Sequence, residues 1–530
     1  MHYNAFIKQK EDANMLNSKK LKMLVSLMAA LILCLSSVSA MACTAIYVGS
    51  DLTADGTTMF ARSEDISNSH NKLFYVSPAG NHAAGEEYAG CYGFTYTFTK
   101  PSYSYTAFSD DNGAAVGNEC PDCGGTHPHT PYEAGGTNEM GVTVSATETI
   151  GCSDAIYAVD PYVDTGIEEA EIPTVLLSEA ATAKEAVTLL LNIYDTAGCA
   201  GGSGVFIADS QETWYIENAS GTQYVALKLS SSMAFAQPNM SIIGLIDLDD
   251  TKNVIASKNL IAVAEQAGAY VGDKEANTID YVASYNADQT AGSRMVNALK
   301  FFNAETAKEE PAVSDYTISN VNAQGDIVPL YTAITLDHAY TVDDVVKYYH
   351  IAGIGSTRNL ETHIFVLSGK DGPTGTVEWV AMDDAALSVF VPYYPMLTTD
   401  TYAGYKLSTL PAEFAAEKPE NAVAYATTKY QRDENGERVP VEGYCALPAN
   451  WANSVYWTMD ALSNLYEAGN LTDEQKTAVA DKLTALQTEC YDAFAQLDAD
   501  ALTPEAATAA SSALAAKVHA ACMELVNAIK

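Results

Sequence analysis

The sequence has few positively charged residues. Its 530 residues include 28 Lys and Arg against 67 Asp and Glu, so the formal net charge at pH 7 is −39. Binding to a nucleic-acid backbone needs a basic surface, and this deficit therefore excludes nucleic acid as a partner. It also disfavours adsorption to anionic lipid headgroups. Because 48% of the residues are hydrophobic and only 18% are charged, the composition is not that of a disordered chain, and a large core can form.

Long apolar runs are equally scarce. The most continuous run, Met23–Leu35, is shorter than the about 20 residues that a helix needs to span a bilayer. It follows a lysine-rich segment and precedes the triplet Ala40-Met41-Ala42, an order typical of a secretory signal peptide. We therefore expect a signal peptide over residues 1–42 and no transmembrane segment. The protein is expected to be exported and to act in the periplasm, at the cell surface or outside the cell.

The expected cleavage site makes Cys43 the first residue of the mature chain. An N-terminal cysteine supports two chemistries that exclude each other. In a lipoprotein the thiol is alkylated and the amine is usually acylated. In an N-terminal nucleophile hydrolase both groups stay free, and the thiolate attacks an amide. The α-amine, with a pKa of about 7.7–8.0, then accepts the proton and returns it.

The residues around Cys43 favour the hydrolase. A lipobox usually has Leu three residues before the cysteine, whereas Ala40 stands there in this chain. The residues after it, Cys43–Gly49, have the pattern of a buried strand rather than of a flexible tether. Two alternatives stay open. One is a non-catalytic, lipid-anchored surface protein with an acylated Cys43, and the other is a small buried cysteine that merely begins a strand.

A predicted hairpin brings charged side chains to this cysteine. Asp55-Gly56 is a turn signal between two strand-like runs, Ala45–Val48 and Thr57–Ala61. The returning strand then places Arg62-Ser63-Glu64-Asp65 level with Cys43. A nearby cation lowers the pKa of a thiol, and a carboxylate can orient an ammonium group or an arginine. The alternative is an ordinary ion pair at the end of a strand.

These segments resemble a known family. Cys43–Gly49 followed by Asp55–Asp65 is similar to the opening of the secreted dipeptidases (cysteine dipeptidase A type) of the N-terminal-nucleophile hydrolases. It resembles bile salt hydrolases and penicillin V acylases more distantly. Further resemblances follow in the family's order and cover most of residues 43–395. They lie at residues 137–149, 204–217, 236–239, 285–294, 356–363, 375–379 and 391–394.

The resemblance implies a fold, a reaction and a set of site residues. The fold is α+β, a four-layer αββα sandwich, and the reaction is hydrolysis of a dipeptide without a cofactor or a metal ion. An N-acyl amide hydrolase of the same superfamily stays open as an alternative. Cys43 would be the nucleophile, with Arg62 and Asp65 in the pocket beside it. Asn138 and Asn239 would bind the oxyanion, and Arg294 would support the nucleophile's electrostatics. Asn359, which follows Arg358, replaces the family's threonine while His363 keeps its place, so Asn359 and His363 are left out of the site.

The other cysteines suggest structural roles. Their even number in an exported protein is typical of disulfides, whose pairing the sequence leaves open. They are Cys91, Cys120, Cys123, Cys152, Cys199, Cys445, Cys490 and Cys522. Cys120 and Cys123 lie close to His127 and His129, a spacing that is tight for zinc. It favours a disulfide-stapled loop over a metal or redox site.

Periodicity suggests three regions after the signal peptide. Residues 43–406 form the hydrolase domain, with helical patches at residues 173–194, 258–266 and 342–350. Residues 407–450 are polar and are expected to be a linker or crossing segment. Residues 451–530 are alanine-rich and are predicted to form a helical appendage with helices over 454–468, 473–494 and 504–529. Whether the chain forms a homo-oligomer stays open.

Overall fold

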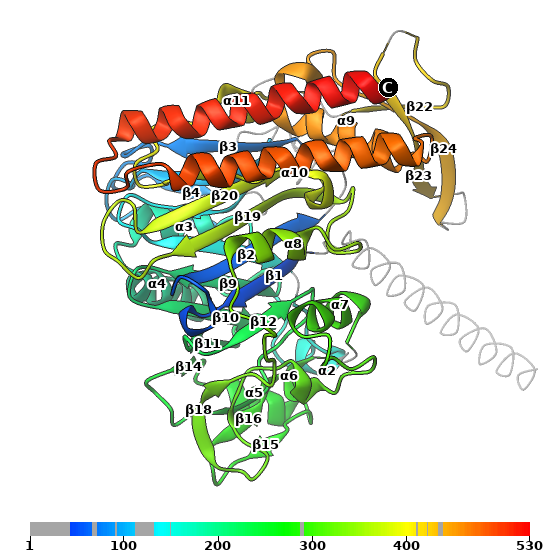
Figure 1. Cartoon of the computed structure of the whole chain (residues 1–530). Coiled ribbons are helices and arrows are strands. Elements are labelled where there is room, and N and C mark those ends of the chain that lie inside the picture. The colour runs from blue at the N-terminus through cyan, green and yellow to red at the C-terminus, as the bar shows by residue number, and fades with distance from the viewer. Residues whose placement is uncertain are drawn as a thin grey trace, which may run out of the picture. The chain divides into compact units, whose positions relative to one another are not determined.

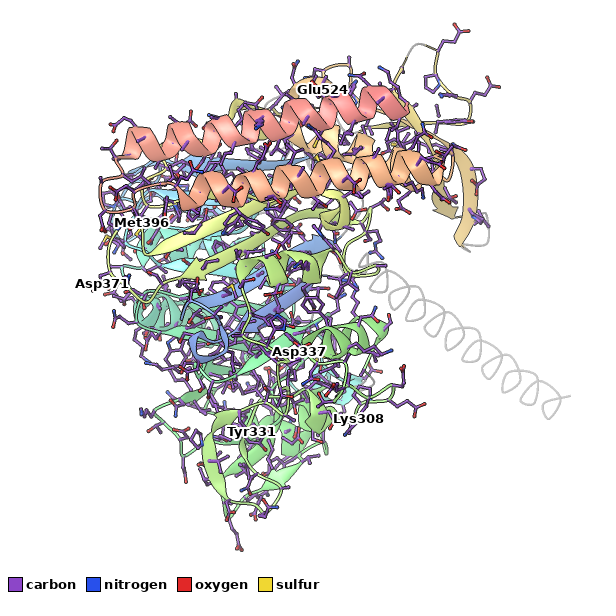
Figure 2. The ribbon with its side chains drawn as sticks, viewed as in Figure 1. Lys308, Tyr331, Asp337, Asp371, Met396 and Glu524 are labelled. Atoms are coloured by element: carbon purple, nitrogen blue, oxygen red, sulfur yellow. The ribbon has the colours of Figure 1, made fainter. Side chains whose placement is uncertain are left out.

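The computed structural model describes residues 43–65, 71–90, 93–111, 132–148, 150–286, 291–409, 412–420, 422–432 and 438–530. Figure 1 shows the arrangement of the helices and strands, and Figure 2 shows charged side chains such as Asp371 and Glu524 projecting from the surface. The predicted signal peptide and the pair Cys120 and Cys123 lie outside the described residues. No helix in the described ranges is long and apolar enough to cross a membrane.

The first of the two large sheets is built around the predicted hairpin. Its strands pair in the order β12-β1-β2-β19-β20-β21 within the described part of the chain. Their bounds are β12 (Ala234–Gln237), β1 (Thr44–Val48), β2 (Thr58–Asp65), β19 (Asn359–Leu367), β20 (Thr376–Met382) and β21 (Val391–Tyr393). β1 and β2 are antiparallel with Ala45 opposite Arg62, and Gly56 in the turn has a positive φ of 75°, which glycine adopts without strain.

The second large sheet has the order β14-β11-β10-β9-β8-β7-β6-β3 among the described residues. Its strands are β14 (Val254–Ala256), β11 (Tyr224–Lys228), β10 (Thr213–Asn218), β9 (Ser203–Ala208), β8 (Thr143–Glu148), β7 (Glu133–Thr137), β6 (Tyr105–Asp110) and β3 (Lys72–Ser77). Neighbouring strands in it are antiparallel.

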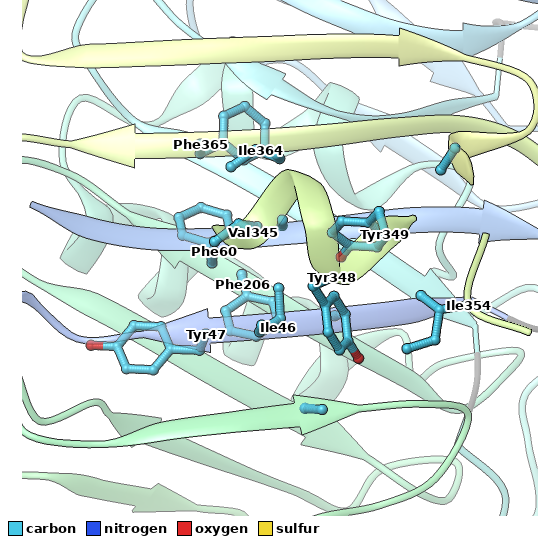
Figure 3. Packing of buried hydrophobic residues seen from close by; sticks show 14 of the residues in the cluster. Ile46, Tyr47, Phe60, Phe206, Val345, Tyr348, Tyr349, Ile354, Ile364 and Phe365 are labelled. Atoms are coloured by element: carbon cyan, nitrogen blue, oxygen red, sulfur yellow. The ribbon is translucent and has the colours of Figure 1, made fainter. Parts of the chain in front are cut away.

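The two large sheets pack face to face. Phe60 of β2 stacks on Phe206 of β9 with ring centroids 5.2 Å apart, and Phe74 of β3 meets Tyr393 of β21 edge to face at 5.0 Å. Figure 3 shows Phe60, Phe206 and Phe365 within this cluster. Such buried aromatic pairs contribute about 0.5–1.5 kcal/mol each beyond the area they bury. Packing between the sheets therefore fixes how their strand ends meet, and this is what positions the candidate site.

Helices lie against both large sheets. α3 (Ile172–Glu179) and α4 (Ala183–Thr196) contact the second sheet, whereas α8 (Val342–Tyr349) contacts β2 of the first. Thr341 caps α8, since its side chain accepts a hydrogen bond from the backbone of Asp344. Figure 3 shows Tyr348 and Tyr349 of α8 in the same buried cluster as Ile46 and Ile354.

The C-terminal region is helical, as its periodicity predicts. α9 (Val455–Glu467), α10 (Asp473–Ala495) and α11 (Pro504–Ile529) each contact the first sheet or the strands next to it. Trp379 of β20 packs against Tyr491 and Phe494 of α10 with ring centroids 5.2 and 5.5 Å away. Figure 1 shows α10 and α11 lying side by side across the sheets.

The polar segment of residues 407–450 has more structure than a linker. It contains a small antiparallel sheet in the order β22-β24-β23, formed by β22 (Glu413–Ala415), β24 (Arg438–Ala446) and β23 (Ala424–Arg432). Tyr425 of β23 donates a 2.9 Å hydrogen bond to Asp460 of α9. The segment thus packs against the C-terminal helices, while the division into three regions stays a prediction.

The remaining elements are short. The helices are α2 (Asp154–Tyr157), α5 (Leu260–Gln266), α6 (Tyr281–Tyr285) and α7 (Ser293–Phe302), and the strands are β4 (Glu87–Ala89), β5 (Thr95–Thr97), β13 (Leu245–Asp247), β15 (Gly272–Asp273), β16 (Thr278–Asp280), β17 (Ser319–Val321) and β18 (Ile327–Tyr331). The chain is therefore of the mixed α+β class, as expected from the sequence.

The expected disulfides are wrong for four cysteines that the structure describes. Cys152, Cys199, Cys490 and Cys522 form no disulfide. Cys199, Cys490 and Cys522 are each at most 1% exposed and fill the core as small apolar side chains. Cys91, Cys120 and Cys123 lie outside the described residues.

Candidate active site

Cys43 lies directly before β1 and is completely buried. The antiparallel register sets Ala45 opposite Arg62, and the same register continued by two residues sets Glu64 opposite Cys43. Because alternate residues of a strand point to the same face, Cys43, Arg62 and Glu64 share one face of the sheet. That face meets the second sheet, since Arg62 Nη1 donates a 3.3 Å hydrogen bond to the carbonyl of Ala134 in β7.

Arg62 connects the cysteine to a group of carboxylates. Its Nη2 atom lies 3.5 Å from Cys43 Sγ and forms an ion pair with Glu169. The same atom lies 3.5 Å from Glu64 Oε2. The side chain of Arg62 is 1% exposed, so these contacts are shielded from water. Charge interactions are stronger in such a buried position than at the surface. The predicted pairing of Cys43 with Arg62 is present in the structure.

Burial raises the pKa of the Cys43 thiol to about 11, and Arg62 opposes this rise. The carboxylates of Glu169, Asp65 and Glu64 raise the pKa further. A second cation beside the sulfur, such as a free α-ammonium group, lowers the pKa of a thiol by the same electrostatic principle as the arginine. Among these groups Arg62 is therefore the one that favours the thiolate, and burial and the three carboxylates oppose it.

Asp65 and Arg294 also meet at this strand end. Arg294 Nη1 lies 2.5 Å from Asp65 Oδ2 and donates a 2.9 Å hydrogen bond to Thr44 Oγ1. Asn359 Nδ2 donates to the other oxygen of Asp65. Asp65 is completely buried, and burial raises the pKa of its carboxyl while Arg294 and Asn359 lower it. The structure thus brings together Cys43, Arg62, Asp65 and Arg294 of the predicted site.

Asn239 follows β12, the strand that pairs with β1. β12 pairs with β1 up to Gln237 opposite Ala45, and Asn239 follows two residues after this last pair. Its φ of 55° is left-handed, a conformation that asparagine tolerates better than most residues. The backbone turns out of the strand at this point and leaves Asn239 at the end of β12 nearest to Cys43.

Asn138 is engaged by the backbone instead. It occupies the turn between β7 and β8, where its Nδ2 donates to the carbonyls of Leu177 and Ala180 at 2.9 and 2.8 Å. Its Oδ1 accepts from the backbone N–H groups of Met140 and Val142, both at 3.0 Å. Both amide hydrogens are therefore committed, and this geometry gives no support to the predicted oxyanion role of Asn138.

Sequence reasoning missed two residues of this site. Glu169 lies in the run Glu168-Glu169-Ala170-Glu171, which has the composition of an exposed turn, although Glu169 is completely buried. Asn359 lies in a segment that the resemblance covers, but it was set aside because it departs from the family's threonine. Its position opposite Asp65 in the pairing of β19 with β2 explains its contact with that carboxylate.

Residues 42–418 match the model of peptidase family C69. The match covers well over half of the chain and begins at the residue before Cys43, so the chain belongs to this family and is a peptidase.

The chain is also similar to named proteins, among them probable dipeptidases. A probable dipeptidase B of Streptococcus pyogenes serotype M18 is 32% identical over 389 residues, which are 69% of this chain and 74% of that protein. A probable dipeptidase of Salmonella dublin is 29% identical over 377 residues, 67% of this chain and 81% of that protein. A mutant of conjugated bile acid hydrolase from Clostridium perfringens is 12% identical with a TM-score of 0.30, over 64% of this chain and 89% of its own.

Proposed function

We propose that this chain is an exported dipeptidase whose mature form begins at Cys43 and which cleaves dipeptides through a thioester on that cysteine. The observation that carries the proposal is the contact of 3.5 Å between Arg62 Nη2 and Cys43 Sγ, at the start of the region shared with family C69. The named dipeptidases among the relatives support the substrate class.

The reaction would proceed in two halves. The α-amine of Cys43 takes the thiol proton, and the thiolate attacks the carbonyl carbon of the scissile peptide bond. The tetrahedral oxyanion collapses, the C–N bond breaks, and the α-ammonium group gives its proton to the leaving amine. A water molecule, deprotonated by the α-amine, then hydrolyses the thioester and releases the acid.

The charged residues at the strand end would serve this reaction. Arg62 stabilises the thiolate, and Asp65, held by Arg294, lies at the end of β2 where the freed ammonium group would be. Asn239 is the proposed oxyanion donor, a contribution that is worth about 3–4 kcal/mol of barrier in other hydrolases. The layers of the fold would then be the αββα sandwich of N-terminal-nucleophile hydrolases, extended by the C-terminal helices.

The first experiment is the intact mass and N-terminal sequence of the protein from the exported fraction. A chain that begins at an unmodified Cys43 is the expected result. The second experiment measures kcat/KM on a panel of dipeptides and N-acyl amino acids, with the Cys43→Ser variant as the control. We expect dipeptide cleavage that falls by at least about a thousandfold in the variant.

Three other results would each contradict the proposed dipeptidase or its mechanism. A mass that carries acyl chains would favour the lipid-anchored protein, because an acylated amine cannot act as the base. Cleavage of the N-acyl amino acids without cleavage of the dipeptides would favour the alternative function, an N-acyl amide hydrolase, over the dipeptidase. A terminus elsewhere, with Cys43 internal, would sink the mechanism.

A further inference from the structure

Arg62 is held by a carboxylate that lies far from it in the sequence. Glu169 precedes α3 and is completely buried. Its Oε1 pairs with Arg62 Nη2, and its Oε2 accepts a 2.7 Å hydrogen bond from the backbone N–H of Glu148 at the end of β8. The carboxylate therefore bridges the arginine to the second sheet and is itself fixed at both oxygens.

The nitrogen that Glu169 holds is the one that faces the cysteine. Arg62 Nη2 carries two hydrogens and lies 3.5 Å from Cys43 Sγ. With one hydrogen directed to Glu169, the other is available to the sulfur. Within the described part of the chain, the second terminal nitrogen donates a 3.3 Å hydrogen bond to the carbonyl of Ala134. The orientation of the guanidinium group toward the thiol thus depends mainly on Glu169.

The neighbouring carboxylates have cations or histidines of their own. Glu64 lies 2.7 Å from the ammonium group of Lys72, which also pairs with Asp110. Glu361 lies 2.9 Å from Nδ1 of His363. Among the buried acids around the cysteine that the structure describes, Glu169 is the one whose ion pair is made with Arg62 at hydrogen-bonding distance.

We propose that Glu169 is the positioning residue for Arg62, and that its negative charge limits how far the arginine activates the Cys43 thiol. This inference rests on the proposed function of Cys43 as the nucleophile. It gives the carboxylate two separable effects. Its geometry places the guanidinium group, and its charge raises the pKa of the thiol, as the directions of the charge interactions at Cys43 indicate.

The test uses the mature enzyme and the substitution Glu169→Gln. A glutamine has one oxygen, so it cannot accept from both Arg62 and the backbone of Glu148, and one contact is lost. We expect kcat to fall by about tenfold or more while KM changes little, because the contact acts on the nucleophile rather than on substrate binding. Removal of the charge should at the same time give about three- to tenfold more thiolate at pH 7.

Thiolate is measured apart from turnover. The rate of alkylation of Cys43 by iodoacetamide is followed from pH 6 to 11, with the modified peptide identified by mass spectrometry. The matched control is Glu133→Gln. Glu133 is also buried, but it accepts from Tyr75, Tyr105 and Thr174 rather than from Arg62, so its loss should leave the thiol pKa unchanged.

The outcomes separate this inference from the proposed function. If E169Q lowers the melting temperature and leaves the thiol pKa where it was, Glu169 is structural and the inference fails. If E169Q does not fold, Glu169→Asp decides, since it keeps the charge and shortens the reach. The inference requires in that variant a thiol pKa that is no lower than in the wild type together with a lower kcat, and a wild-type kcat overturns it. A wild-type enzyme that cleaves no dipeptide, with the thiol shift in E169Q intact, refutes only the proposed function.

Discussion

At the scale of one residue, Asn138 lies in the motif that the sequence singles out, but its side chain has a structural role in place of the predicted oxyanion role. The side chain lies at the turn of a hairpin and makes four hydrogen bonds to backbone groups. Two of these end at the carbonyls of Leu177 and Ala180 at the C-terminus of α3, where helix carbonyls lack partners within the helix. The residue thus joins the hairpin to the helix that follows Glu169.

The substitution Asn138→Ala separates structure from catalysis. It leaves buried backbone groups unpaired, and each such group costs about 1–3 kcal/mol. We expect the free energy of unfolding in urea to fall by about 3 kcal/mol in total, with kcat/KM within about threefold of wild type where the variant is folded. A fall of about a hundredfold or more in kcat with unchanged stability would instead establish Asn138 as an oxyanion donor.

At the scale of elements, local patterns predicted local structure. The Asp55-Gly56 signal gave the hairpin of β1 and β2 with Cys43 level with Glu64, because a turn and alternation fix a register by themselves. The helix at 173–194 is interrupted between Glu179 and Ala183. Thr472 and Thr503 cap α10 and α11 with 3.3 Å hydrogen bonds, as their place before the helical pattern indicates.

Long-range pairing is what the sequence could not supply. Glu169 and Arg62 are 107 residues apart, and an acid in a charged run has no local mark of burial. The sheet within residues 407–450 is missed for a similar reason, since the segment is polar overall and the contact of β23 with α9 depends on residues further along the chain. The contacts of Asp65 with Arg294 and Asn359 likewise depend on how distant strands meet.

The docking of α10 on the first sheet can be tested at one side chain. Gln487 accepts from the backbone N–H of Phe390 at 2.7 Å and donates to its carbonyl at 3.2 Å. The substitution Gln487→Met keeps the side-chain length and removes both hydrogen bonds. We expect a loss of about 2–3 kcal/mol in the free energy of unfolding, measured with urea, because two buried backbone groups lose their partner.

A control in the same helix region isolates that effect. Gln496 follows α10 and is exposed, so Gln496→Met should change the stability by less than about 0.5 kcal/mol. Equal stability of the two variants would show that α10 does not depend on the Phe390 contact in solution.

At the scale of the whole molecule, an acidic chain also buries many carboxyl groups. Burial raises the pKa of Glu217 and Asp460 to about 7 each and that of Glu378 to about 8. The folded state therefore holds protons that the unfolded state, with a carboxyl pKa of about 4, has released. Stability is then highest below the unfolded pKa values and is lost as the pH rises through the folded ones. The net charge of −39 acts in the same direction, since self-repulsion grows with pH.

We therefore expect the melting temperature to fall by at least about 3 °C between pH 6.5 and pH 8.5. Below pH 6.5 the buried His363, whose pKa is lowered by burial, opposes the trend, because an unfolded histidine binds a proton there.

The carboxyl effect can be tested at Glu378 alone. Glu378 is completely buried and accepts a 2.7 Å hydrogen bond from Thr106 across the two sheets, and Glu378→Gln mimics its protonated form. The slope of stability against pH should be flatter in this variant by up to about 1.4 kcal/mol per pH unit, the value for one linked proton. Stability is measured by urea unfolding of E378Q and of the wild type at pH 6.5, 7.5 and 8.5. Parallel curves of stability against pH would show that Glu378 is ionised in the folded protein and that groups other than Thr106 stabilise its buried charge.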